Sequence, residues 1–130
     1  MRKYPKRRKG SKYRSGLESK IAKQLSTKKI PILYETVKLA YSKPISQHIY
    51  TPDFVLPSGV IIEAKGLFSS ADRKKHLLVQ EQHPTLDIRF VFSYSCKKLY
   101  KGSKTTYADW CDKHGFIYAD KLIPKEWFNV

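Results

Sequence analysis

Apolar residues recur at helical spacing near the start of the chain and at strand spacing further on. Leu17, Ile21 and Leu25 stand four residues apart, which predicts a helix with Ser15 as its N-cap. The helix should end near Pro31, because the residue before a proline is disfavoured in the helical conformation. Alternating apolar and polar positions then predict three strands, over residues 33–41, 48–56 and 60–65.

The second half of the chain alternates helices with strands. The pattern predicts helices over residues 72–82 and 106–114 and strands over residues 87–93 and 116–119. Gly115 should end the last helix, and Trp127 should pack the C-terminal segment onto the core. The order α-β-β-β-α-β-α-β predicts a mixed α/β fold, with a central β-sheet flanked by helices.

The chain carries a large excess of positive charge. Its 130 residues have a formal net charge of +15, which favours nucleic acid as the partner. Residues 1–14 hold eight Lys and Arg residues and no acid, so we predict a basic disordered arm followed by one domain over residues 15–130. For the arm, a merely solubilising or nonspecific tail is the alternative.

Neither a membrane nor an oxidising compartment is predicted. No apolar run approaches the ~20 residues that a membrane-spanning helix needs. Two cysteines, Cys96 and Cys111, are too few for a disulfide framework. We therefore expect a cytoplasmic protein with no membrane partner.

Acidic residues are scarce in the first half of the chain, where four acids among the first 65 residues face fifteen Lys and Arg residues. Two of these acids are Asp53, which follows a proline, and Glu63, which lies two residues before Lys65. Carboxylates on a surface built for phosphates repel the ligand unless a divalent cation lies between them. Because Mg²⁺ prefers carboxylate and carbonyl oxygens, Asp53, Glu63 and the Ala64 carbonyl are candidate ligands.

Strand geometry brings these residues together. In the strand over residues 60–65, Glu63 and Lys65 share one face. If the strand over residues 48–56 pairs with it as a hairpin, Asp53 lies beside Glu63, and the lysine can orient a water or offset charge on a phosphate. The alternative is an ordinary ion pair between Glu63 and Lys65, with Asp53 as a turn residue.

The two earlier acids have simpler interpretations. Glu18 lies three residues after Ser15, which is the spacing of a capping box, so helix-start chemistry explains it completely. Glu35 is expected to be an exposed strand residue and receives no role.

Several stretches of the chain resemble a known family: Arg14-Ser15-Gly16-Leu17-Glu18, Tyr50-Thr51-Pro52-Asp53-Phe54, Asp72-Arg73-Lys74-Lys75-His76-Leu77-Leu78, Glu81-Gln82-His83-Pro84, Lys98-Leu99-Tyr100-Lys101-Gly102-Ser103 and Ala119-Asp120-Lys121-Leu122-Ile123-Pro124. They resemble the phage endonuclease I family of Holliday junction resolvases, a branch of the PD-(D/E)xK nuclease superfamily. The resemblance runs from about Arg14 to Trp127. It implies an αβββαβ restriction-endonuclease-like core and a phage origin, hence the host cytoplasm.

The resemblance also implies an active site and an assembly. The catalytic residues would be Glu18, Asp53, Glu63 and Lys65. Asp53 would bridge two Mg²⁺ or Mn²⁺ ions, with Glu63 and the Ala64 carbonyl on the first ion and Glu18 on the second. The family forms an intertwined, segment-swapped homodimer, so Glu18 would act in trans and residues 40–47 would cross between subunits.

The activity implied is resolution of four-way (Holliday) DNA junctions by paired nicks. Two symmetric nicks need two active sites, which a two-fold homodimer supplies. A junction is recognised by shape and backbone, so we expect phosphate contacts from basic residues. These candidates are Arg2, Lys3, Lys6, Arg7, Arg8, Lys9, Lys12, Arg14, Arg73, Lys74, Lys75 and His76, although for His76 a capping or merely exposed position is the alternative.

Two other functions fit the sequence. One is a non-catalytic basic nucleic-acid-binding module, and the other is a restriction-like or mismatch nuclease that acts on duplex DNA. The binding module would associate with nucleic acid in a salt-sensitive way and cleave it in no metal, whereas paired-nick mapping would reveal the duplex nuclease.

Overall fold

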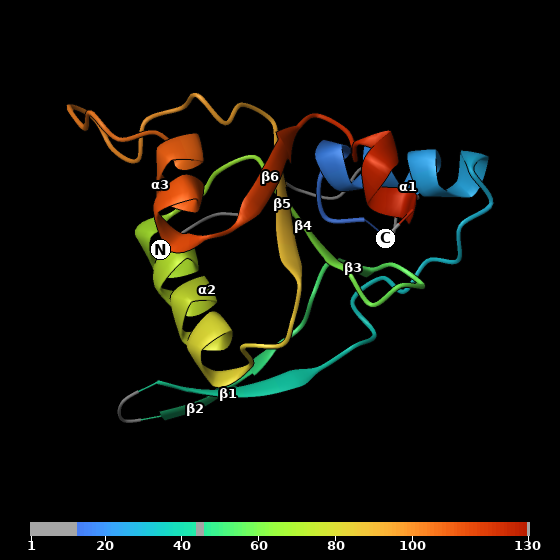
Figure 1. Ribbon diagram of the computed structural model, residues 1–130, viewed down its shortest axis with the longest axis horizontal. Coiled ribbons are helices and arrows are strands. Elements are labelled where there is room, and N and C mark those ends of the chain that lie inside the picture. Colours follow the sequence, from blue (N-terminus) through green and yellow to red (C-terminus); the bar gives the residue numbers. More distant parts are fainter. Residues whose placement is uncertain (1–12, 44–45, 130) are drawn as a thin grey trace.

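A four-stranded sheet lies between two layers of helix in the computed structural model, which describes residues 13–43 and 46–129 (Figure 1). Its strands are in the order β3 (Phe54–Val55), β4 (Ile61–Lys65), β5 (Ile88–Phe92) and β6 (Ile117–Asp120). β3 runs antiparallel to β4, and the other neighbours are parallel. The predicted mixed α/β class with a flanked central sheet is confirmed.

Helices cover both faces of this sheet. One face carries the two crossover helices, α2 (Ser70–Gln82) and α3 (Tyr107–His114), and the other carries α1 (Gly16–Thr27) and the short 3₁₀ helix η1 (Lys125–Asn129) (Figure 1). Within the described ranges, no helix is long and apolar enough to cross a membrane.

Alternate residues of β4 serve the two layers. Ile61 belongs to the apolar cluster that includes Phe90 and Trp110, whereas Ile62 belongs to the cluster that includes Ile21 and Trp127. The strand period predicted this division. It also fixes which face receives Glu63 and Lys65, namely the face that carries Ile61 and α2.

Helix ends follow the capping chemistry of the sequence. Ser15 accepts the Glu18 backbone N–H at 3.1 Å, as predicted for an N-cap. α2 begins at Ser70, two residues before the predicted start, because Ser69 and Asp72 form a capping box there. Gly115 ends α3 with a φ of 75°, in the left-handed region that glycine adopts without strain.

Two predicted strand ranges are wrong. The stretch over residues 33–41 is irregular until β1 (Leu39–Lys43), apart from an isolated bridge between Tyr34 and Phe54. The stretch over residues 48–56 splits into β2 (Ser46–Tyr50) and β3. It breaks at Pro52, which has no N–H to donate to a ladder, and at Asp53, whose side chain accepts the Ala64 N–H.

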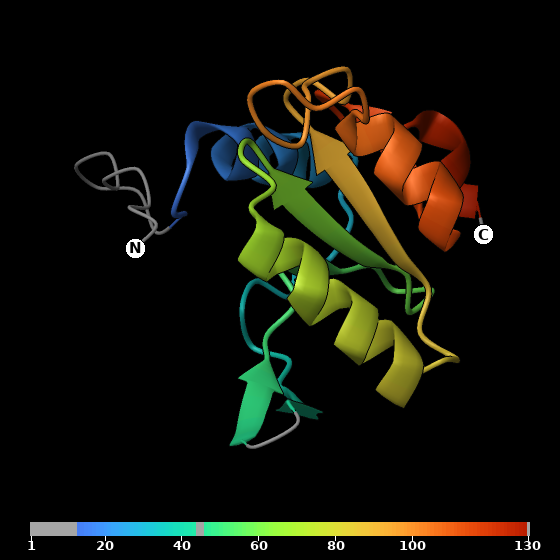
Figure 2. The same cartoon turned by 90° about the vertical axis from the view of Figure 1, so that its left-hand side faces the viewer.

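β1 and β2 form an antiparallel hairpin separate from the four-stranded sheet (Figure 2). The hairpin contacts the C-terminal end of α2, where the Ser42 N–H donates to Gln82 Oε1 at 2.6 Å. Its register pairs Leu39 with Tyr50 and Ser42 with Gln47 within one chain. Residues 44–45, at its tip, lie outside the described residues. The hairpin occupies the place where the resemblance implied a crossing between subunits.

The core contains one ionisable ring with no hydrogen-bond partner. His76 of α2 is 0% exposed, and both ring nitrogens lack a partner within the described ranges. It packs edge-on against Tyr50 and Phe90, with ring centroids 5.5 and 4.9 Å away. Burial lowers the pKa of His76 well below 6.5, and the positive charges of Lys65 and Lys75 lower it further.

This burial predicts acid sensitivity. The folded state keeps His76 neutral while the unfolded state takes up a proton below about pH 6.5, so the wild-type free energy of unfolding should fall by about 1.4 kcal/mol per pH unit relative to His76→Leu. Urea unfolding of both proteins at pH 7.5, 6.5 and 5.5 measures this difference. Parallel stability curves would contradict the expected linkage.

Candidate active site

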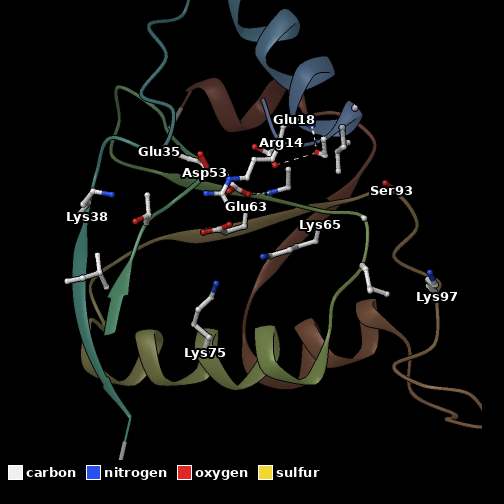
Figure 3. Close-up of a pocket in the computed structure, with 18 residues that line it drawn as sticks. Arg14, Glu18, Glu35, Lys38, Asp53, Glu63, Lys65, Lys75, Ser93 and Lys97 are labelled. Atoms are coloured by element: carbon white, nitrogen blue, oxygen red, sulfur yellow. Dashed lines mark hydrogen bonds and ion pairs between the residues drawn. The ribbon is translucent and has the colours of Figure 1, made fainter. Parts of the chain in front are cut away.

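A pocket of about 800 Å³ opens beside β4. Its walls come from the start of α1, the segment before β1, the β3–β4 pair, α2 and the loop after β5 (Figure 3). Acidic and basic side chains both line it: Glu18, Glu35, Asp53, Glu63, Arg14, Lys38, Lys65, Lys75 and Lys97. All four acids of the first 65 residues therefore converge on one place.

The β3–β4 register places Asp53 beside Glu63. Phe54 pairs with Ile62, so the preceding residue on one strand faces the following residue on the other. Asp53 Oδ2 accepts the Ala64 N–H at 3.0 Å, which fixes this carboxylate against the strand. The predicted lateral approach of Asp53 to Glu63 is confirmed.

Glu63 is the most deeply buried of these acids, at 2% exposure, and it accepts a hydrogen bond from the Tyr50 hydroxyl. Burial raises the pKa of Glu63 well above 4.5, and the negative charge of Asp53 raises it further. Lys65 and the Tyr50 hydrogen bond act in the opposite direction. The carboxylate is thus held in a place that favours a neighbouring positive charge.

Glu18 serves two purposes at the start of α1. Its backbone N–H is capped by Ser15, while its carboxylate enters the pocket and accepts a hydrogen bond from the Tyr34 hydroxyl. Burial and then the charge of Asp53 raise the pKa of Glu18 to about 7. The capping interpretation is therefore incomplete, because the carboxylate, which also accepts from the Ser15 hydroxyl at 3.4 Å, reaches Tyr34 and lines the pocket.

Glu35 is a member of the site that sequence reasoning missed. Its N–H donates to the Asp53 carbonyl at 3.3 Å, and its carboxylate pairs with Arg14 at 2.8 Å. Its positive φ of 51° turns the chain there, so the predicted exposed strand position is wrong. The scarcity of acids in the first half of the chain was the one signal that could have identified it.

The donor set suits a hard divalent cation. One carboxylate oxygen from each of Glu18, Glu35 and Asp53 lies within 4.8 Å of the others. The charge of Asp53 also raises the pKa of Glu63. Asp53 is therefore a neighbour both of Glu18 in this cluster and of Glu63 on β4. Carboxylates alone, with no thiol or imidazole among them, match Mg²⁺ or Mn²⁺ better than softer metals.

Two lysines lie near these acids, Lys65 on β4 and Lys75 on α2 (Figure 3). Lys65 Nζ lies 3.7 Å from Asp72 Oδ1. Lys75, from α2, points into the pocket, and burial followed by the nearby charge of Lys65 lowers its pKa. The lysine predicted beside the acids is thus accompanied by a second one.

The predicted phosphate contacts at the start of α2 separate into different environments. Arg73 donates to the Phe68 carbonyl at 2.7 Å, while Lys74 is exposed. His76 is a correction, because a side chain with no exposed surface cannot reach a phosphate. Arg14 lines the pocket, and the other predicted contacts lie outside the described residues: Arg2, Lys3, Lys6, Arg7, Arg8, Lys9 and Lys12.

A strongly basic protein with paired carboxylates and a lysine on adjacent strands of a mixed sheet has the features of a nuclease. The chain belongs to the phage endonuclease I family, whose sequence model matches residues 1–130. It is 61% identical over 115 residues to Endodeoxyribonuclease 1 of Enterobacteria phage T3, covering 88% of this chain and 76% of that relative. It is 60% identical over 122 residues to Endonuclease I of Escherichia phage T7, covering 94% and 82%.

Proposed function

We propose that this endonuclease is a divalent-metal-dependent enzyme that resolves four-way DNA junctions by paired nicks. The observation that carries the proposal is the convergence of Glu18, Asp53, Glu63 and Lys65 in one pocket that lysine and arginine side chains also line. A DNA substrate agrees with the name of the phage T3 relative, Endodeoxyribonuclease 1. Specificity for junctions rests on the resemblance of the matching sequence stretches to junction-resolving nucleases.

Asp53, Glu63, the Ala64 carbonyl and Glu18 would hold Mg²⁺, with Mn²⁺ as a substitute and two ions in each site. Bound Mg²⁺ supplies positive charge to the phosphate and lowers the pKa of water. Lys65 binds a phosphate oxygen or orients the attacking water from the same strand as Glu63. Tyr50 and Tyr34 hold the Glu63 and Glu18 carboxylates in place through their hydroxyl groups.

We also propose a homodimer, because two opposed nicks need two sites. In the single chain, Glu18 lies beside Asp53 of the same chain. If β1 and β2 of one chain separated, they could pair with those of a second chain in the same register. α1 would then sit on the partner, and Glu18 would act in trans with its contacts unchanged.

Cleavage of a labelled four-way junction, compared with a linear duplex of the same arms, tests the proposal. With Mg²⁺ we expect two symmetric nicks in the junction and little cutting of the duplex, and with Ca²⁺ or EDTA we expect binding without cutting. Tight binding without cleavage in any metal would instead support a binding module. Equal cutting of both substrates would support a duplex nuclease.

Lys75 and Lys74 provide a matched pair on one helix. Lys75 points into the pocket and Lys74 is exposed, so only the first is placed to bind a phosphate near the acids. A charge-assisted hydrogen bond is worth about 1.5–3 kcal/mol, so Lys75→Ala should slow single-turnover junction cleavage by about 10- to 100-fold. Lys74→Ala should change the rate by less than about 3-fold. Equal effects of the two substitutions would contradict this assignment.

A further inference from the structure

The loop that follows β5 carries a concentration of positive charge that the active site does not account for. Between Ser93 and Tyr107 the chain has four lysines and no acid. These are Lys97, Lys98, Lys101 and Lys104, and all four are exposed. Two tyrosines accompany them, Tyr94 at 62% and Tyr100 at 66% exposure.

Backbone and hydroxyl groups hold this loop in a defined shape. Leu99 N–H donates to the Thr105 carbonyl at 3.0 Å, and Tyr107 N–H donates to the Lys97 carbonyl at 2.9 Å. Ser95 donates from its N–H and hydroxyl to the Asp120 carboxylate, at 2.6 and 2.7 Å. None of these contacts uses a lysine ammonium group, so the lysines are not needed to shape the loop.

Both ends of the loop are attached to the segment that leaves the catalytic strand. Ser93 N–H donates to the Lys65 carbonyl at 3.2 Å, and the Tyr107 hydroxyl accepts the Phe68 N–H at 3.2 Å. Lys97 lines the pocket itself, on the opposite side from Lys38 (Figure 3). A DNA strand that crossed the pocket between these two lysines would lead onto the loop.

We propose that residues 94–104, which we name the basic loop, bind the sugar–phosphate backbone of a duplex DNA arm that continues out of the active-site pocket. Lys98, Lys101 and Lys104 contact phosphates, and Tyr100 packs against a sugar of the same arm. A surface that is already ordered binds with a smaller loss of conformational entropy than a disordered tail does. The proposal rests on the DNA-cleaving function proposed above and adds contacts outside the pocket, from Lys98, Lys101, Lys104 and Tyr100.

The salt dependence of binding distinguishes direct phosphate contacts from the general attraction between a basic protein and DNA. Each phosphate contact contributes about 0.9 to the slope of log Kd against log salt concentration. The loop variant Lys98→Ala, Lys101→Ala, Lys104→Ala should therefore lower this slope by about 2 to 3 and weaken junction binding by at least about 10-fold at 100 mM salt. Binding is measured without divalent metal in an Asp53→Asn background, so that it does not depend on cleavage.

A control variant removes the same charge from exposed positions that do not line the pocket: Lys23→Ala, Lys113→Ala, Lys125→Ala. Its slope should change by less than about 1. Tyr100→Ala should weaken binding several-fold with the wild-type slope, because it removes an uncharged contact. With Asp53 intact, the loop variant should cleave junctions already bound at saturation within about 2-fold of the wild-type rate, because none of its three replaced lysines lines the active-site pocket.

Equal losses of slope in the loop and control variants would overturn the proposal, as would a wild-type slope in the loop variant. Preferential loss of binding to a single-stranded probe, with duplex binding unchanged, would overturn the assignment to a duplex arm. These outcomes do not depend on whether the proposed function is correct. A wild-type protein that binds but never cuts with Mg²⁺ would refute that function while leaving the slopes to decide on the basic loop.

Discussion

Replacing Asp53 by Asn is expected to reduce junction cleavage by at least about 1,000-fold, equivalent to about 4 kcal/mol of transition-state stabilisation. Asp53 is the acid whose charge raises the pKa of both Glu18 and Glu63 most, so its replacement affects both parts of the donor set. An asparagine oxygen can still accept the Ala64 N–H, so the strand pairing should survive. Single-turnover cleavage with Mg²⁺ measures the loss.

Junction binding by Asp53→Asn should not be lost together with cleavage. Asp53→Asn removes a negative charge next to the phosphates, so affinity for the junction should be equal to or tighter than that of the wild type. The pKa of Glu18, raised to about 7 in part by Asp53, should fall in the variant and can be followed by carboxyl NMR titration. Asp112→Asn, on the exposed surface of α3, is the matched control and should cleave normally. Retention of more than a tenth of wild-type activity by Asp53→Asn would remove Asp53 from the catalytic set.

Local periodicity predicted the part of the site that depends on a single strand pair. Glu63 and Lys65 share a face because side chains alternate, and Asp53 follows from the turn that joins β3 to β4. The wrong strand ranges have a related cause. Residues 33–38 alternate apolar and polar positions, yet their backbone contacts are confined to the bridge of Tyr34 with Phe54 and the hydrogen bond from the Glu35 N–H to the Asp53 carbonyl. Alternation indicates which side chains are buried, but it does not indicate whether another strand pairs with the backbone of the segment.

Glu18 and Glu35 show what a pattern leaves out. Glu18 satisfied the rule for a helix start, and nothing local indicated that its carboxylate would turn to Tyr34 instead of closing the capping box. Glu35 is placed by a turn with positive φ and by backbone contact with Asp53, eighteen residues away in sequence. Both positions depend on tertiary packing, which sequence spacing does not encode.

The segment of α2 from Arg73 to His76 shows the same limit of sequence patterns for basic residues. Four adjacent positively charged or titratable side chains look equivalent in sequence, but a helix turns about 100° per residue and sends them to different places. Lys75 reaches the pocket, Lys74 is exposed, and His76 enters an aromatic core. Only the packing of α2 on β4 and β5 decides which lysine meets the acids.

Two inactive variants should restore activity when combined in one dimer, if Glu18 acts in trans. A heterodimer of Glu18→Ala and Asp53→Ala chains would contain one pocket with every acid intact and one pocket that lacks both residues. It should nick junctions at about half the wild-type rate, because one of two symmetric sites remains. On a supercoiled plasmid with a cruciform, it should give nicked circles where the wild type gives linear DNA. Co-expression with two different tags and tandem purification isolates the heterodimer.

The pair Asp53→Ala with Glu63→Ala is the control, because both residues belong to the same β3–β4 unit and neither pocket can be complete. This heterodimer should stay inactive whether Glu18 acts in cis or in trans. Failure of the two tagged chains to co-purify would refute the homodimer. Co-purification without nicking by the Glu18→Ala and Asp53→Ala pair would show that each chain uses its own Glu18, with the β1–β2 hairpin closed within each subunit.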